Sequence, residues 1–240
     1  MKKLILLLLF IPLVSFGQTK LSRLEKKILK QVSLNQEDAV IFLEKVVNIN
    51  SGTLNKKGVR MVGASFRSAF DDINFSTQWI EMPEEMNRAG HLFAYKKGSK
   101  GKKLLLIGHL DTVFEENSPF QTFERRDTIA YAPGGNDMKG GNVVMLFALK
   151  ALDDLNLLDN STITVAMTGD EESTGKPLSI SRKDLIDAAK NSNIALGFEN
   201  STGYNNATIA RRGSSGWSVT TTGKRAHSSG IFRDSIGAGA

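Results

Sequence analysis

The feature of this sequence that most constrains its fold is a regular alternation of short apolar runs with helical stretches. The strand-like runs cover residues 75–82, 92–95, 103–108, 162–167 and 194–198. Between them, apolar residues follow the spacing of an amphipathic helix at 141–155 and 179–190. Strands that alternate with helices are typical of an α/β domain whose mostly parallel sheet is flanked by helices on both faces. We therefore predict this fold class.

The segments on either side of the alternating region have different patterns. Helical spacing predicts two helices within 20–48, with Asn35 as the N-cap of the second, and a third helix over 57–70. After residue 207, apolar and polar residues alternate, which indicates the start of a new sheet.

The first residues have the three parts of a secretory signal peptide. Lys2 and Lys3 precede an apolar run that ends at Val14, and small or neutral residues follow up to Gly17. We expect residues 1–17 to be removed, because the run is much shorter than the ~20 apolar residues that cross a bilayer. The chain has no cysteine, which excludes a lipid-modified cysteine and a disulfide framework. The mature protein is expected to be secreted or periplasmic, with no membrane attachment.

The charge of the chain is too low to indicate a nucleic-acid partner. The formal net charge is +6, and removal of the two lysines of the leader leaves +4, with acids and bases interspersed. The densest basic stretch, residues 96–103, has no aromatic residues between its lysines on which bases could stack. We interpret this stretch as a solvated hairpin turn with charged flanks.

Metal-ligand residue types follow the predicted strands, where the ligand crevice of an α/β sheet lies. The strand at 103–108 leads directly into His109 and Asp111, which are two positions apart and so lie on the same side of an extended chain. One of the two can bind a metal while the other orients the imidazole. On this pair alone, the signal is weak, because a histidine at a strand end is more often a hydrogen-bonded structural residue.

A glycine-rich loop at 131–141 carries Asp137 at its centre and opens a predicted helix. A phosphate-binding loop is the alternative, but the spacing of its glycines matches neither of the common phosphate-binding motifs. A carboxylate would also repel phosphate. We interpret Asp137 as a carboxylate that points into the crevice, in a backbone that glycine allows to bend sharply.

Acidic residues follow two further strands. Asp170, Glu171 and Glu172 come after the strand at 162–167, and Glu199 closes the last strand. Three consecutive carboxylates raise one another's pKa values, and a nearby cation reverses that cost. A solvated acidic turn is the alternative for this motif taken alone. Together, the four strand-end motifs predict a two-metal site, since mixed histidine and carboxylate ligands suit zinc and a shared acid bridges two ions.

The motifs G-H-L-D-T-V, G-G-N-D-M-K-G-G and G-D-E-E make the chain resemble the M20 family of metallopeptidases and amidohydrolases, in particular its glutamate carboxypeptidase group. The resemblance implies a catalytic domain over residues 18–210 and a lid or dimerisation domain of α+β type that starts at 211–240. It implies two zinc ions, or other divalent ions such as cobalt or manganese. Family members often have a cis peptide after the bridging acid, which is Asp137 here.

The resemblance also assigns roles to residues. It implies that His109 and Glu199 bind one zinc, that Glu172 binds the second and that Asp137 bridges both. Asp111 would support His109, and Glu171 would be the general base. His227 is similar to the lid histidine that reaches the partner subunit's active site in a homodimer and stabilises an oxyanion. The catalytic residues that the resemblance implies are thus Glu171, Asp111 and His227.

The expected function is hydrolysis of a peptide or N-acyl amide bond in a small peptide or N-acyl amino acid. Exopeptidase or carboxypeptidase action and deacylation both remain open, as does a catalytically inactive relative that binds peptides or carboxylates. The presence of Asp111 and Glu171 argues against the inactive relative, since a binding protein needs neither. Because the chain stops within the expected lid, we expect the 240-residue chain to lack one zinc ligand and to be inactive.

Overall fold

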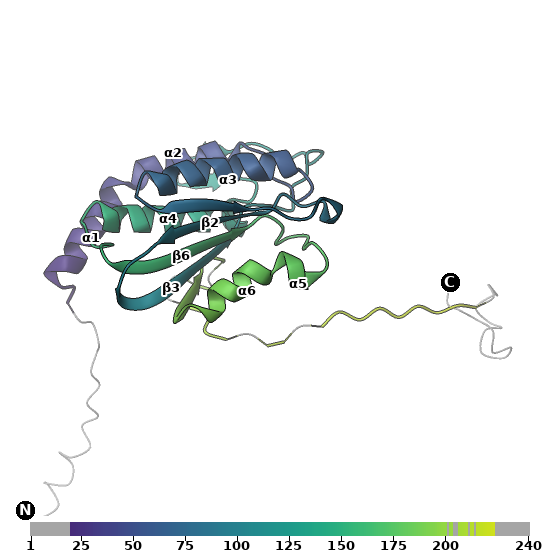
Figure 1. Cartoon of the computed structure of the whole chain (residues 1–240). Helices are drawn as coiled ribbons and strands as arrows, with labels where there is room; N and C mark the ends of the chain where they lie inside the picture. Colours follow the sequence, from purple (N-terminus) through teal and green to yellow (C-terminus); the bar gives the residue numbers. More distant parts are fainter. Residues whose placement is uncertain (1–19, 201, 204–205, 211, 214, 224–240) are drawn as a thin grey trace, which may run out of the picture. The chain divides into compact units, whose positions relative to one another are not determined.

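The computed structural model describes residues 20–200, 202–203, 206–210, 212–213 and 215–223. The chain divides into two units, Met1–Asn200 and Ser201–Ala240. The helices and strands found among the described residues all belong to the first unit. This unit is built around a five-stranded sheet with helices on both faces (Figure 1). The predicted α/β class with a mostly parallel sheet is confirmed.

The sheet has the strand order β1–β2–β6–β3–β7. Its strands are β1 (Ser76–Ile80), β2 (His91–Lys96), β3 (Lys100–His109), β6 (Ser161–Thr168) and β7 (Ile194–Gly197). Strand β2 is antiparallel to both β1 and β6, so the other four strands point the same way. The central strands β3 and β6 have near-continuous apolar runs because both faces of the sheet are covered.

The register of the parallel strands aligns their carboxyl ends. His109 at the end of β3 pairs with Thr168 at the end of β6, and Ile107 pairs with Gly197 at the end of β7. The segments that follow these three strands therefore begin at one edge of the sheet. This alignment brings residues far apart in the sequence to one place.

The connection between β2 and β3 is not the hairpin turn that the basic stretch 96–103 suggested. Strand β6 lies between β2 and β3 in the sheet, so the two strands are not hydrogen-bonded to each other. Lys96 is also not fully solvated, since its Nζ donates to Asp153 Oδ1 at 2.9 Å and to the carbonyl of Ile73 at 3.1 Å. Local sequence shows where the chain turns, but β6, which comes much later in the chain, decides which strands pair.

Three helices cover one face of the sheet: α2 (Gln36–Val47), α3 (Lys56–Asp71) and α4 (Gly140–Asp153). The apolar side of α3, with Val62, Phe66 and Phe70, is fully buried in the main core. Burial of a large apolar side chain stabilises a fold by about 1.5–3 kcal/mol. Helix α3 also has a side-chain cap, because Asn55 accepts the N–H of Gly58 at 3.0 Å.

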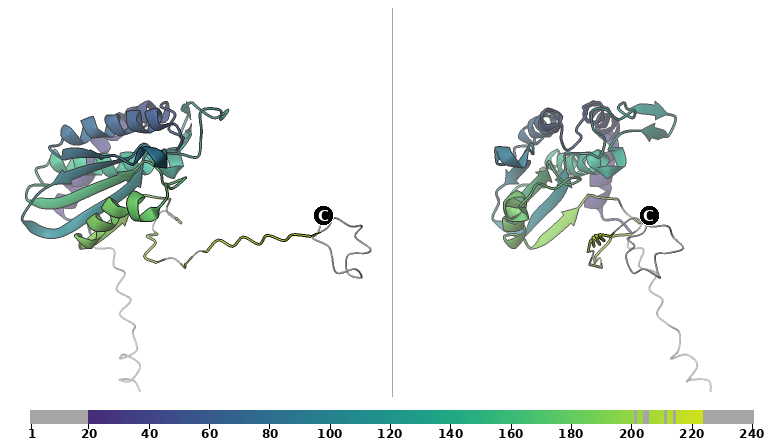
Figure 2. Two further views of the ribbon diagram at one scale, coloured as in Figure 1. Left: turned by 45° about the vertical axis from the view of Figure 1, so that its right-hand side comes forward. Right: turned by 90° about the vertical axis from the view of Figure 1, so that its right-hand side faces the viewer.

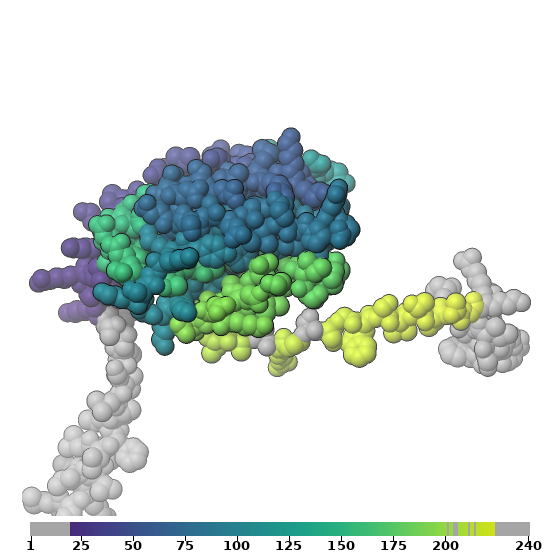
Figure 3. Space-filling view, in the orientation of Figure 1, coloured from purple at the N-terminus to yellow at the C-terminus, as the bar shows by residue number. Residues whose placement is uncertain are grey.

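The other face of the sheet is covered by α5 (Leu178–Ser181) and α6 (Lys183–Lys190). Leu185 and Ala188 of α6 pack on a smaller core formed by Phe93, Leu105 and Ala166. Figure 3 shows these helices, in green, lying against the blue strands. The sequence predicted a single helix over this segment, and the structure breaks it at Arg182, whose φ and ψ of −110° and 2° are not helical.

The sequence did not predict a small antiparallel hairpin, which consists of β4 (Glu124–Arg126) and β5 (Ile129–Tyr131). It projects from the body of the first unit in the right-hand view of Figure 2. Its three-residue strands are exposed, so they lack the apolar run by which the other strands were recognised. Two short helical turns lie at Glu84–Met86 and Gly135–Lys139.

The first helix, α1 (Arg23–Leu34), begins with a capping box that the sequence analysis did not identify. The Ser22 side chain accepts the N–H of Glu25, and the Glu25 carboxylate accepts the N–H of Ser22. Asn35 occupies the predicted N-cap position of α2, but its side chain makes no cap hydrogen bond. It donates instead to Asp154 Oδ2 at 3.1 Å, which ties the α1–α2 junction to the end of α4.

In the second unit, the described residues form neither helix nor strand. The expected lid segment, 211–240, lies largely outside the described residues, and the expected signal peptide lies wholly outside them. Both therefore stay predictions. None of the helices in the described part of the chain has the length and apolar character needed to cross a membrane.

Candidate metal centre

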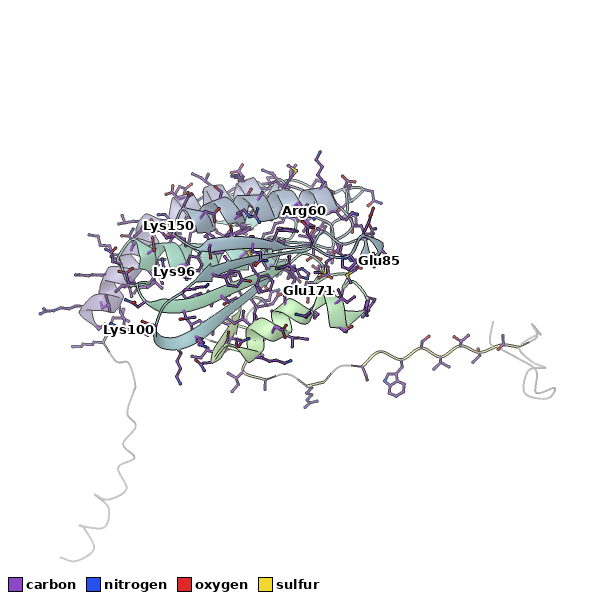
Figure 4. The ribbon with its side chains drawn as sticks, in the orientation of Figure 1. Arg60, Glu85, Lys96, Lys100, Lys150 and Glu171 are labelled. Atoms are coloured by element: carbon purple, nitrogen blue, oxygen red, sulfur yellow. The ribbon has the colours of Figure 1, made fainter. Side chains whose placement is uncertain are left out.

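The candidate residues gather at the edge of the sheet where β3, β6 and β7 end. His109 is the last residue of β3, residues 171–172 lie in the loop after β6, and Glu199 follows β7 by two positions. Figure 4 shows Glu171 at this end of the sheet and Lys100 at the opposite end. The site thus occupies the position that strand topology predicts for a ligand crevice.

Four predicted metal ligands come together around the His109 ring. Its Nε2 lies 2.9 Å from Oδ1 of Asp137 and 3.4 Å from Oε1 of Glu199. One potential ligand atom from each of His109, Asp137 and Glu172 lies within 4.8 Å of the other two. The imidazole is 1% exposed, whereas the Asp137 side chain is 55% exposed. The cluster therefore has a buried side, at His109, and a solvent-accessible side, at Asp137.

The donor set of this cluster fits a divalent metal ion. One imidazole nitrogen and several carboxylate oxygens are ligands that zinc and similar ions accept. Burial, with the negative charge of Asp137 as the next cause, raises the pKa of Glu172 to about 6. A nearby cation reverses this unfavourable crowding of carboxylates, because it stabilises their charged form.

Asp137 is placed by the glycine-rich loop that opens α4. Gly134 has a φ of +67°, a left-handed conformation that glycine adopts easily, and a Cβ there would overlap the Thr112 side chain. The peptide bond from Asp137 to Met138 is cis, as the family resemblance implied. Met138 is buried, so it anchors the loop directly beside the exposed carboxylate of Asp137.

Asp111 lies beneath the cluster and contacts three of its parts. Its Oδ1 accepts the N–H of Glu171 at 3.0 Å, and its Oδ2 accepts the N–H of Glu172 at 3.1 Å. The Nδ1 of His109 is 3.0 Å from the Asp111 carbonyl oxygen and 3.4 Å from its Oδ1. The main-chain carbonyl and the carboxylate of Asp111 therefore both face Nδ1 of His109, and the carboxylate also fixes the backbone of both glutamates.

The three consecutive acids after β6 do not form one group. Asp170 is fully buried, and its Oδ1 accepts from Nη1 of Arg182 at 2.6 Å while its Oδ2 accepts the N–H of Gly175 at 2.8 Å. Glu171 is exposed and Glu172 is partly buried. Asp170 thus anchors the loop, and the two glutamates are left to face the cluster.

Sequence comparisons place the chain among known proteins. The profile of peptidase family M20/M25/M40 matches residues 105–211, a segment that contains the residues of the cluster. Carboxypeptidase G2 from a Pseudomonas strain is 33% identical over 216 residues, which cover 87% of this chain. The chain is homologous to the M20 peptidases.

A second curated relative is similar to a shorter part of the chain. A probable succinyl-diaminopimelate desuccinylase from Staphylococcus aureus is 32% identical over 69% of the chain. The chain spans about half the length of the curated relatives it matches, with 50% of carboxypeptidase G2 and 40% of this desuccinylase covered.

Solved structures show the same fold at lower identity. Human carnosine dipeptidase 1 has a TM-score of 0.62 and 17% identity, over 73% of this chain and 41% of its own length. An M20 family metallo-carboxypeptidase from Sulfolobus solfataricus has a TM-score of 0.51 and 20% identity, over 66% of this chain and 36% of its own. The α/β unit is therefore the fold of an M20 peptidase domain.

The cluster is supported by polar residues that sequence reasoning missed. Lys139, 1% exposed, donates to the carbonyls of Val46 and Ile49 at 2.9 and 2.8 Å, and burial lowers its pKa to about 7. Asn142 Nδ2 donates to the carbonyl of His109 at 2.6 Å. Lys139 belongs to the glycine-rich motif and Asn142 directly follows it, so their closeness to Asp137 in the sequence was the available signal.

A second buried histidine, His91, holds the loop after β6 from the other side. Its Nδ1 accepts the N–H of Gly169 at 3.1 Å, which leaves Nε2 to donate to the carbonyl of Ser181 at 2.8 Å. His91 follows no predicted strand and no motif contains it, so nothing local in the sequence marked it.

The electrostatic surroundings of His109 favour its protonated form when no metal is bound. Burial lowers the pKa of His109, but the hydrogen bond and charge of Asp111, together with the charges of Glu199 and Glu171, raise it to about 9. The Asp111 carboxyl has a lowered pKa although burial acts against this, because His109 and Thr53 donate to its charged form. His227, the predicted lid histidine, lies outside the described residues.

Proposed function

We propose that this protein is a metal-dependent hydrolase of peptide or N-acyl amide bonds with a dinuclear zinc site. The observation that carries the proposal is the convergence of His109, Asp137 and Glu172 within 4.8 Å, with Glu199 3.4 Å from the same imidazole. The named activities of two relatives support it, since a carboxypeptidase and a desuccinylase both cleave bonds of this kind.

In this proposal, His109 and Glu199 would hold one ion, Glu172 would hold the other and Asp137 would be shared by both. Zinc suits these donors, and cobalt or manganese would fit the same set. When bound, the ions supply a Lewis acid that polarises the scissile carbonyl and lowers the pKa of water. The buried imidazole of His109 is pre-oriented for this role, because contacts with Asp111 hold its Nδ1 and leave Nε2 towards the cluster.

Glu171 is the proposed general base. Its exposed side chain adjoins the cluster, and its main chain is fixed by the hydrogen bond to Asp111. The carboxylate accepts a proton from the attacking water and then passes this proton to the nitrogen of the leaving amine. A carboxylate with both tasks must be accessible to substrate, which its exposure permits.

The wider parts of the proposal follow the family resemblance. The substrate is a small peptide or an N-acyl amino acid, His227 stabilises the oxyanion across a homodimer, and the mature protein acts outside the cytoplasm. Two measurements on the full-length gene product test these points. Its molecular mass in solution shows whether it is a dimer, and N-terminal sequencing of the exported protein shows whether the leader is removed. A monomer would contradict the role of His227, and an uncleaved leader would contradict export by a signal peptide.

The activity is tested on the full-length gene product loaded with zinc. A panel of dipeptides and N-acyl amino acids separates peptidase from deacylase action. We expect turnover of members of one class, loss of turnover after chelation and recovery when zinc is restored. Absence of turnover across the panel by zinc-loaded protein would contradict the proposal.

A Glu171→Gln variant tests the base assignment. It removes the proton acceptor while it keeps the size of the side chain. We expect kcat to fall by about 10²–10⁴-fold with zinc content unchanged. Glu85→Gln is the matched control, because Glu85 is an exposed glutamate outside the cluster and should keep full activity. Equal rates for the two variants would rule out Glu171 as the base.

A further inference from the structure

A threonine from the N-terminal part of the chain is tied to the metal cluster through Asp111. The hydroxyl of Thr53 donates to Oδ2 of Asp111 at 2.7 Å. Thr53 is 2% exposed and Asp111 is fully buried, so water does not replace this hydrogen bond. The two residues are 58 positions apart, and no motif of the sequence analysis contains Thr53.

The carboxylate that Thr53 contacts is divided between two tasks. Oδ1 accepts the N–H of Glu171 and faces Nδ1 of His109, and Oδ2 accepts the N–H of Glu172. Among the described residues, Thr53 supplies the side-chain donor to Oδ2. Its hydrogen bond therefore fixes the rotation of the Asp111 carboxylate about its Cβ–Cγ bond. This rotation in turn determines where the His109 imidazole and the N–H groups of Glu171 and Glu172 can lie.

Thr53 is itself held in place by its own segment. Gly52 and Thr112 form a parallel bridge, and the N–H of Thr112 donates to the carbonyl of Ser51 at 2.9 Å. Asn50 Nδ2 donates to the carbonyl of Phe114 at 2.9 Å. Because these contacts hold the backbone of the segment, little additional conformational entropy is lost in forming the Thr53–Asp111 hydrogen bond.

We infer that Thr53 is a positioning residue of the metal site that acts through Asp111. It orients His109 on one side and fixes the backbone of the paired glutamates, Glu171 and Glu172, on the other. This inference rests on the proposed metal-dependent function, because it assigns Thr53 to the geometry of that site. Groups that orient metal ligands in this way affect metal affinity although they do not touch the metal.

The test compares Thr53→Ala with Thr53→Ser in the full-length gene product. Both variants remove the methyl group, and only the serine variant keeps the hydroxyl. Zinc dissociation constants are measured by competition with a chromophoric chelator, and the melting temperature of the metal-free protein is recorded for each variant. We expect Thr53→Ala to weaken zinc binding by about 10–100-fold and Thr53→Ser to stay close to the wild type.

Thr77→Ala is the matched control for loss of a threonine–aspartate hydrogen bond. Thr77 donates to Oδ1 of Asp71 at 2.8 Å, far from the cluster in the sequence and on the partly exposed strand β1. This variant should keep wild-type zinc affinity. If Thr53→Ala does not fold, the nearly isosteric Thr53→Val takes its place in the comparison.

The outcomes separate this inference from the proposed function. Equal zinc affinity for the hydroxyl-free variant and Thr53→Ser, with a wild type that binds zinc, would overturn the role of Thr53 and leave the proposed function intact. A lower melting temperature without a change in zinc affinity would also overturn it. Failure of the wild type to bind zinc would instead contradict the proposed function.

Discussion

The guanidinium of Arg182 lies against the buried carboxylate of Asp170, with Nη1 2.6 Å from Oδ1. Nη2 of the same guanidinium donates to the Asp170 carbonyl at 3.1 Å and to the Thr174 hydroxyl at 3.1 Å. Arg182 also separates α5 from α6. One side chain therefore holds both ends of the loop that presents Glu171 and Glu172.

Replacement of Arg182 by methionine should strongly destabilise the protein. The change leaves a buried charge at Asp170 without its partner, and loss of one member of a buried pair typically costs about 3–5 kcal/mol. Urea denaturation followed by circular dichroism measures the free energy of unfolding. The double variant Arg182→Met with Asp170→Asn should recover part of the loss, because it removes the unpaired charge.

Lys183→Met is the control for this prediction. Lys183 pairs with Asp187 at 2.9 Å, but the two side chains are 65% and 48% exposed. An exposed pair contributes little to stability, because water screens its charges. If the Lys183 variant lost as much stability as the Arg182 variant, burial of Asp170 would not be the cause.

Gly141→Ala should disturb the position of Glu199. A Cβ at Gly141 would overlap the carbonyl oxygen of Phe198, the residue before Glu199. Alanine favours a helix over glycine by about 1 kcal/mol, but overpacking typically costs about 1–3 kcal/mol. We therefore expect lower stability and weaker zinc binding. Gly197→Ala is the comparison, since a Cβ there meets no atom within 4 Å; equal effects of both changes would refute the clash.

The metal-free protein should lose stability as the pH rises because of His109. Its pKa is about 9 in the folded chain against an ordinary value of 6.5. Between these values the folded chain keeps a proton that the unfolded chain releases, so this stabilisation is complete below 6.5 and is lost as the pH rises through about 9.

Comparison with His109→Gln isolates this effect. Lys139, whose pKa is lowered to about 7, acts in the opposite direction, but it is present in both proteins. In the presence of a chelator, the stability of the wild type relative to the variant should decrease from pH 6 to pH 9.5. A difference that does not change with pH would contradict the raised pKa of His109.

Ser22→Ala should loosen α1 without a large effect on the rest of the fold. The change removes the hydroxyl that caps the N–H of Glu25, and loss of such a cap costs about 1 kcal/mol. Since α1 has no buried residues, little tertiary packing depends on it. Amide hydrogen exchange should accelerate over Arg23–Leu34 and stay unchanged in β3 and β6. Acceleration in the central strands would show that α1 supports the core.

Much of the candidate metal site was visible in the sequence, because its residues follow the strands directly. His109, Asp137 and Glu172 were each predicted from a local motif, and the structure brings them together. The separate role of Asp170 was not visible, since three adjacent acids look alike in a sequence. Its partner, Arg182, lies 12 positions away in a segment that was predicted to be a continuous helix.

The sequence by itself determined the fold class, the main helices and strands, and the carboxyl-end placement of the ligands. These follow from hydrophobic periodicity and from residues adjacent in the chain, which are local properties. Only the tertiary structure decided that β6 lies between β2 and β3, that Arg182 neutralises Asp170 and that Thr53 reaches Asp111. Each of these features depends on contacts between segments that are distant in the sequence. The free energy of such contacts comes from burial and from the pairing of charges and hydrogen bonds, which a local sequence pattern does not predict.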